Sequence, residues 1–161
     1  MFLFSRRNQR IEVHKLVRRL IDNSAPNRVP STGDARWENR SNRSLPVLLT
    51  PYDGAKVCVD ELVHAVTKDL CSQGLALVLP HPFRAEQVVV GFWSDEQTHF
   101  VSGIVRQNVP FGGGFWQLGV ELTALFSLAE HPELKRLVPL AVRLDPRVNL
   151  DALNASQLVR S

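Results

Sequence analysis

Apolar residues recur at three- and four-residue spacing near the start of the chain. Between Arg10 and Ile21 this pattern predicts one amphipathic helix with arginines on its polar side. An Asp-Asn-Ser run and Pro26 are expected to end the helix. Residues 22–44 then lack apolar periodicity and are rich in Pro, Asn, Ser and Arg, which indicates a loop or linker.

The centre of the chain consists of short runs rich in β-branched and aromatic residues, separated by turn sequences. This pattern predicts an antiparallel sandwich or barrel, and a barrel is favoured because closure removes exposed strand edges. Residues 57–70 fit either one bent strand or two strands joined by a turn. The other expected strands are Leu45–Thr50, Gly74–Leu79, Gln87–Trp93, Phe100–Val109 and Phe115–Leu122.

Two further segments are defined by their turn and helix signals. The run Gly112-Gly113-Gly114 is expected to be a hairpin loop, because it lacks the lysine and the following helix of a phosphate-binding loop. After Thr123 the apolar spacing becomes helical again, and Pro132 is expected to begin a new helix at its first turn.

Charge is distributed unevenly along the 161 residues. Residues 1–43 contain ten Lys and Arg against four Asp and Glu, while residues 44–161 contain nine against twelve. A basic arm on a mildly acidic body suggests that the arm meets an anionic partner. A hydrophobic content of 44% indicates a globular body.

Few residues suggest catalysis or metal binding. Cys58 and Cys71 form no metal-ligand pair and are expected to be reduced thiols. The five histidines are scattered, so neither a metal site nor an enzyme is expected. No apolar run approaches the roughly 20 residues of a membrane span, and a signal-peptide core is missing. We therefore expect a cytoplasmic protein with no membrane span and no cofactor.

Three short motifs follow one another along the chain. They are Arg36-Trp-Glu-Asn-Arg40 with Arg43 close behind, Pro46-Val47 at the first strand, and Asp69-Leu-Cys71-Ser-Gln-Gly74 between two strands. This ordered set resembles the PilZ family, whose pattern is Arg-x-x-x-Arg followed by Asp/Asn-x-Ser-x-x-Gly. The runs Leu75–Leu79, Phe100–Arg106 and Leu118–Leu122 are also similar to strands of that family.

The resemblance implies a mainly β fold, a six-stranded antiparallel PilZ-like barrel with flanking N-terminal and C-terminal helices. The expected organisation is a helix and basic linker over residues 1–35, a barrel domain over 36–123 and a helical extension over 124–161.

The resemblance also implies a ligand, cyclic di-GMP. Arg36 and Arg40, with Arg43 as a possible third contact, would grip phosphate or guanine through the planar guanidinium fork. Asp69 would accept hydrogen bonds from a guanine edge. Gly74 would allow close backbone approach or a positive φ beside the ligand.

Two positions depart from the family pattern. Cys71 stands where the family has serine, and a thiol is a poorer hydrogen-bonding group than a hydroxyl. The arginine pair can be read either as Arg36 and Arg40 or, in a shortened version, as Arg40 and Arg43.

The favoured interpretation is a receptor that relays the second messenger to an unidentified effector protein when its arginine segment becomes ordered. The N-terminal helix is a candidate for effector contact, and either terminal helix for homo-oligomerisation, because an apolar stripe must be covered. One alternative is an adaptor that kept the barrel and lost the ligand. Another is a small barrel that binds nucleic acid; the strands show no exposed aromatic and basic face that would favour it.

Overall fold

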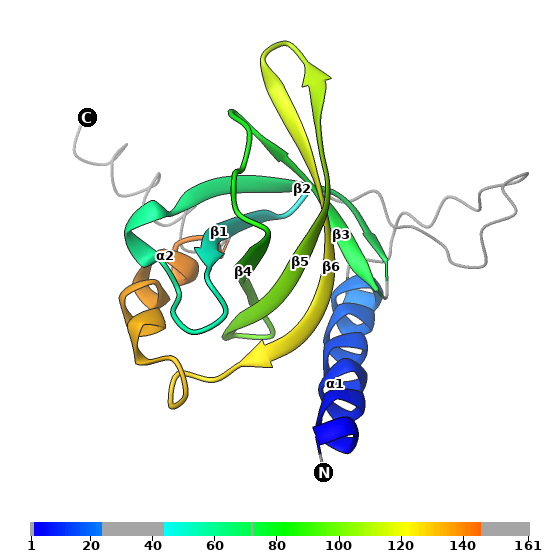
Figure 1. Cartoon of the computed structure of the whole chain (residues 1–161), viewed down its shortest axis with the longest axis vertical. Coiled ribbons are helices and arrows are strands. Elements are labelled where there is room, and N and C mark those ends of the chain that lie inside the picture. The colour runs from blue at the N-terminus through cyan, green and yellow to red at the C-terminus, as the bar shows by residue number, and fades with distance from the viewer. Residues whose placement is uncertain (1, 24–43, 72, 146–161) are drawn as a thin grey trace, which may run out of the picture.

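The computed structural model describes residues 2–23, 44–71 and 73–145 (Figure 1). It contains six strands, two α-helices and two short 3-10 helices within those ranges. The strands are β1 Pro46–Tyr52, β2 Val63–Cys71, β3 Gly74–Leu79, β4 Gln87–Ser94, β5 Gln97–Gly112 and β6 Phe115–Phe126. The helices are α1 Phe2–Asn23, η2 Val59–Glu61, η3 Pro132–Arg136 and α2 Val138–Val142.

All six strands pair antiparallel and close into a barrel in the order β1-β2-β3-β6-β5-β4. The predicted fold class is therefore confirmed. The ring closes between β1 and β4, where Leu48 lies opposite Gly91. On the other side of the ring β3 pairs with β6, and Ala76 lies opposite Gly119.

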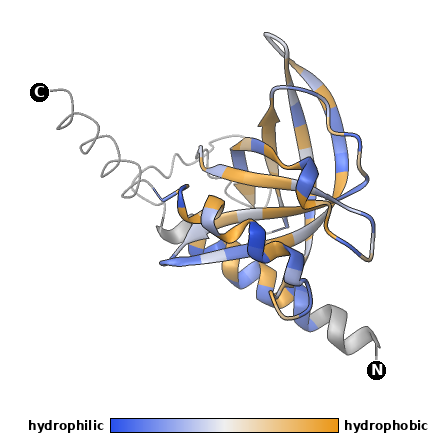
Figure 2. Ribbon diagram, turned by 90° about the vertical axis from the view of Figure 1, so that its left-hand side faces the viewer, coloured by the Kyte–Doolittle hydropathy of each residue, from blue (hydrophilic) through white to orange (hydrophobic). Residues whose placement is uncertain are grey.

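The interior of the barrel is filled by alternate side chains of each strand. In β3, Leu75, Leu77 and Leu79 are buried, while Ala76 and Val78 between them are half-buried. This is the two-residue period of a sheet with one face in the core, and hydrophobic and hydrophilic segments alternate along the strands in Figure 2. Burying each large apolar side chain contributes about 1.5–3 kcal/mol to the stability of the fold.

Helix α1 covers its apolar stripe with the barrel of its own chain. Val13, Leu16, Val17 and Leu20 are buried in the same cluster as the inward-facing strand residues, and the helix packs against β6 and β2. The stripe therefore has its cover within this chain, so it is not a free surface for an effector or a second copy. Ile11, which was also expected on this face, is exposed.

The predicted start of α1 was wrong. The helix begins at Phe2 rather than at Arg10 and continues to Asn23; Ser24 and Pro26, which were expected to end it, lie outside the described residues. Arg, Gln and Leu are good helix formers, and adding a residue to an existing helix avoids the cost of nucleation. The helix therefore extends through residues that have no apolar periodicity.

The C-terminal segment packs on the outside of β1, β4 and β5. Leu48 and Phe100 point outward there and form a second buried cluster with Leu134, Leu137 and Ala141. Pro132 begins η3, as predicted. The helical structure expected directly after Thr123 was wrong, because β6 continues to Phe126 in its pairing with β5.

The remaining ambiguous segments have simple structures. Residues 57–70 form an isolated bridge between Tyr52 and Val57, then η2, then the single strand β2. The three glycines 112–114 all have positive φ and form the hairpin between β5 and β6, as expected. Ile104 is the last residue of β5 that pairs with β4, and β5 continues beyond it. Figure 1 shows the resulting two-stranded arm rising beyond the barrel.

Candidate functional site

A cleft of about 320 Å³ opens on the outer surface where β2, β3, β5 and β6 lie side by side. Gly74 and Ala76 lie two residues apart on β3, and Ala76 lies opposite Gly119 on β6. They have no side chain or only a methyl group, so the larger side chains around them leave a depression. The full lining is Asp69, Cys71, Gln73, Gly74, Leu75, Ala76, Arg106, Gln107, Gln117, Gly119, Val120 and Glu121.

All three site residues predicted on the barrel line this cleft. Asp69 lies in β2 opposite Ala76, directly after a register shift between Thr67 and Asp69. A bulge of this kind changes the direction in which the next side chain points. Asp69 therefore belongs to the strand rather than to the turn that follows it.

Cys71 and Gly74 hold the turn between β2 and β3. The Cys71 thiol donates to the carbonyl oxygen of Gly74 at 3.4 Å, and the two residues are cross-strand partners. A Cβ at Gly74 would overlap the carbonyl oxygen of Val120 on β6. Gly74 is not among the described glycines with positive φ, and its lack of a side chain permits the close approach of the β6 backbone.

Arg36, Arg40 and Arg43 lie outside the described residues, as does Ser72. The described chain resumes at Ser44, before β1. The backbone N–H of Leu45 donates to Thr67 Oγ1 at 2.8 Å, and the N–H of Thr67 donates to the Leu45 carbonyl at 2.9 Å. The attachment point of the arginine segment is thus two residues along β2 from Asp69.

Two charged residues of the cleft were not predicted from the sequence. The Nε of Arg106 donates to Glu121 Oε2 at 2.7 Å, and its Nη2 lies 2.7 Å from the same oxygen. On α1, the Nη2 of Arg10 lies 3.7 Å from Glu121 Oε1. The Glu121 carboxylate therefore lies between the helix and β5 at the edge of the cleft.

The sequence gives only a weak indication that Arg106 and Glu121 form a pair. A register shift between Val105 and Gln107 interrupts the two-residue alternation of β5 at Arg106. Sequence alternation alone therefore does not assign Arg106 to a face of the barrel. The small residues at Ala76 and Gly119, between buried leucines and valines, were the signal that could have located the cleft.

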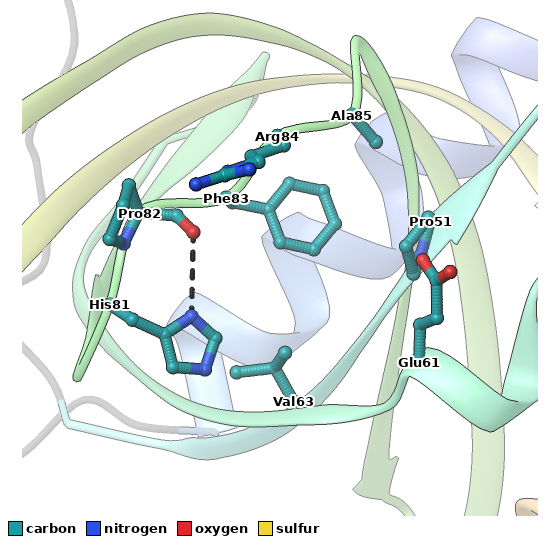
Figure 3. Close-up of a pocket in the computed structure, with 8 residues that line it drawn as sticks. All are labelled: Pro51, Glu61, Val63, His81, Pro82, Phe83, Arg84 and Ala85. Atoms are coloured by element: carbon teal, nitrogen blue, oxygen red, sulfur yellow. Dashed lines mark hydrogen bonds between the residues drawn. The ribbon is translucent and has the colours of Figure 1, made fainter.

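A second pocket, of about 340 Å³, lies between the end of β1, the start of β2 and the connection from β3 to β4 (Figure 3). Phe83 and Val63 form its apolar part, and Figure 3 shows the side chains of Arg84 and Glu61 on different sides of it. It contains none of the residues predicted to bind the ligand.

The arm formed by β5 and β6 carries exposed aromatic residues. Phe111 and Phe115 are 46% and 49% exposed, and Lys68 Nζ lies 5.0 Å from the centroid of the Phe111 ring. The expectation that no aromatic and basic residues share an exposed face was therefore wrong. The arm extends past the barrel, so its side chains have no core to enter.

The described part of the chain contains neither a cluster of metal-ligand side chains nor a membrane-spanning helix. No group of three or more His, Cys, Asp or Glu side chains there is arranged to hold a metal ion. None of the described helices has the length and apolar character needed to cross a bilayer.

Comparison with known proteins finds similarity among solved structures but not among families or curated proteins. No family model matches the chain, and no curated protein does. Among solved structures, the chain is similar to the PilZ domain of CeSA from a cellulose synthesizing bacterium. The chain resembles a PilZ domain. The two share 20% identity at a TM-score of 0.35, over 62% of this chain and 93% of the CeSA domain. The closed six-stranded barrel is established by the strand pairing described above.

Proposed function

We propose that this chain is a cyclic di-GMP receptor that passes the level of the messenger to an effector protein, and that it is not an enzyme. One observation carries the proposal. Asp69, Cys71 and Gly74, chosen from the sequence, line a single open cleft, and the segment that contains Arg36 and Arg40 joins the barrel beside it.

The position of Ser44 supports a contact between the arginines and the cleft. Pro46 pairs with Val66 antiparallel, so the chain before Pro46 approaches from the end of β2 that carries Asp69. Arg40 is five residues before Leu45, a distance of up to about 17 Å for an extended chain. Both arginines of the motif are therefore within reach of a ligand in the cleft.

The chemistry of the cleft suits one end of such a ligand. A carboxylate at Asp69 accepts hydrogen bonds from the N1–H and N2–H₂ of guanine. The floor of Gly74, Ala76 and Gly119 lets a flat base approach the backbone closely. At about 320 Å³ the cleft is near the lower limit for small-molecule sites. It would therefore hold part of a dinucleotide, and the arginine segment would cover the rest.

A barrel that serves as an adaptor without the ligand is the second candidate. The Cys71 thiol is already bonded to Gly74 within its own turn, so it offers little to a ligand. The lining of the cleft contains two carboxylates and one arginine, a balance that disfavours an anion unless Arg36 and Arg40 contribute. A nucleic-acid-binding barrel is the third candidate, favoured by Lys68 and the exposed Phe111 of the arm.

Calorimetric titration with cyclic di-GMP separates these candidates. We expect binding by the wild type and a loss of about tenfold or more in affinity for Arg36→Ala and Arg40→Ala, because each removes a charge-assisted contact. Arg28→Ala is the matched control, since it removes the same charge from the same linker outside the motif. If no heat is released at about 100 μM protein, the receptor is ruled out and the adaptor without the ligand remains as the candidate. Strong, salt-dependent binding to arbitrary oligonucleotides would favour the third candidate.

A further inference from the structure

Arg106 is the one cationic residue among those that line the cleft. Its guanidinium group is already paired with Glu121. Both its Nε and its Nη2 lie 2.7 Å from Oε2 of Glu121. A carboxylate and a phosphate use the same guanidinium donors. A phosphate that approaches Arg106 along its Nε–Nη2 edge, the edge that allows a bidentate contact, must therefore compete with Glu121 for those donors.

The exposure of the pair makes this competition possible. The Arg106 side chain is 61% exposed and that of Glu121 33% exposed, so a ligand can reach the guanidinium without unfolding the barrel. An ion pair between two exposed side chains is weak, and a charge-assisted contact to phosphate can exceed it.

Glu121 also has an alternative partner. Its Oε1 lies 3.7 Å from Nη2 of Arg10 on α1. A carboxylate that gives up Arg106 would still face a positive charge on the helix. Release of Arg106 therefore does not leave Glu121 without a counter-ion, and the cost of the exchange is reduced.

We propose that Glu121 is an internal competitor that lowers the affinity of the cleft for a phosphate-bearing ligand by occupying Arg106 in the free protein. This inference rests on the proposed function, because it concerns the same cleft and the same ligand. It adds Arg106 as a phosphate contact and Glu121 as the residue that sets the affinity. Neither belongs to the sequence motifs that suggested the ligand.

The test is a double-mutant cycle on the full chain with cyclic di-GMP as the titrant. Glu121→Gln should bind cyclic di-GMP about two- to fivefold more tightly than the wild type does. This gain is the energy of an exposed ion pair expressed as a change in affinity. Arg106→Gln should bind about tenfold more weakly through loss of a charge-assisted contact. In the Arg106→Gln background, Glu121→Gln should change the affinity little, because the competition no longer exists.

Controls separate the mechanism from a general effect of charge and from misfolding. Glu130→Gln removes the same charge from an exposed position after β6, outside the cleft, and should leave the affinity unchanged. Thermal unfolding by circular dichroism checks that each variant is folded. The Arg106 side-chain Nε–H resonance should shift on titration of the wild type, a change that a merely structural role would not produce.

The outcomes are distinguishable. If the wild type binds and Glu121→Gln gains nothing, the competitor is overturned while the receptor stands. If the gain persists in the Arg106→Gln background, the effect is general electrostatics and the competitor is again overturned. If neither the wild type nor Glu121→Gln binds cyclic di-GMP, the proposed function fails, and the competitor fails with it.

Discussion

The two opposite sides of the barrel differ in what their outward positions carry. Between β1 and β4 the outward residues include Leu48 and Val89, and the C-terminal segment buries them under Leu134 and Leu137. Between β3 and β6 the outward residues include Gly74, Ala76 and Gly119, and these small residues line an open cleft with charged groups at its rim. Large apolar residues outside a barrel require a cover, whereas small ones leave an accessible depression.

The largest effect is expected on the covered side. Leu134→Ala should reduce the free energy of unfolding by about 2–5 kcal/mol, because it leaves a cavity beside Leu48 and Phe100. Urea unfolding measures the change. Leu128→Ala is the matched control, since Leu128 is 36% exposed and should lose much less. A loss for Leu134→Ala no larger than the control would mean that the C-terminal segment does not cover the barrel.

A smaller effect is expected at the floor of the cleft. Gly74→Ala introduces a Cβ against the carbonyl oxygen of Val120, and backbone must move, at a cost of about 1–3 kcal/mol. Gly119→Ala is the comparison, because its Cβ would lie 3.2 Å from the side-chain Cβ of Gln107 and needs only a slight shift. Equal unfolding free energies for the two variants would contradict the close approach at Gly74.

Acid should weaken the covered side of the barrel through Glu133. Glu133 accepts a hydrogen bond from the backbone N–H of Val57 at 3.1 Å, and this bond is the main reason that the pKa of Glu133 lies below its ordinary value. The stabilisation is complete above that ordinary value, near 4.5, and is lost as the pH falls through the lowered pKa.

The Glu133→Gln variant tests this pH dependence. The wild type should lose stability below about pH 4.5 more steeply than Glu133→Gln, by an amount on the order of 1 kcal/mol for one charge-assisted hydrogen bond. The comparison comes from unfolding curves recorded between about pH 3 and pH 7, a range that includes the titration of carboxyl groups. Parallel curves for the two proteins would assign acid sensitivity to other groups.

The smallest effect concerns the thiol in the cleft. Cys71→Ser restores the hydroxyl of the family pattern, and we expect cyclic di-GMP to bind about two- to fivefold more tightly, the effect of about 0.5–1 kcal/mol for an improved hydrogen bond. Cys58→Ser, at the other free cysteine and outside the cleft, is the control. An unchanged affinity for Cys71→Ser would mean that the thiol does not contact the ligand.

Local patterns predicted the barrel well. The strand Gly74–Leu79 has the predicted bounds, and the neighbouring strands differ mainly in length. Two-residue alternation is a property of each strand alone, so a sequence contains it directly. The end of β6 was missed because residues 124–126 pair with β5, and pairing partners are not local information.

The residues of the site also divide into those that local sequence predicted and those that depend on tertiary structure. Asp69, Cys71 and Gly74 belong to one short motif around one turn, so their shared location followed from the sequence. Arg106 and Glu121 come from different strands, and their contact depends on the register shift in β5. Such contacts are set by tertiary structure. The roles of Arg36, Arg40 and Arg43 remain predictions, since they lie outside the described residues.

The contrast between the two sides also gives the most direct test of the central claim. Backbone amide spectra recorded during a titration with cyclic di-GMP report which side the ligand meets. We predict that the largest shifts occur at Asp69, Gly74 and Gly119 in the cleft, while Leu134 and Leu137 on the covered side stay unchanged. Shifts centred on the second pocket at Phe83, or no shifts at saturating ligand, would contradict the account.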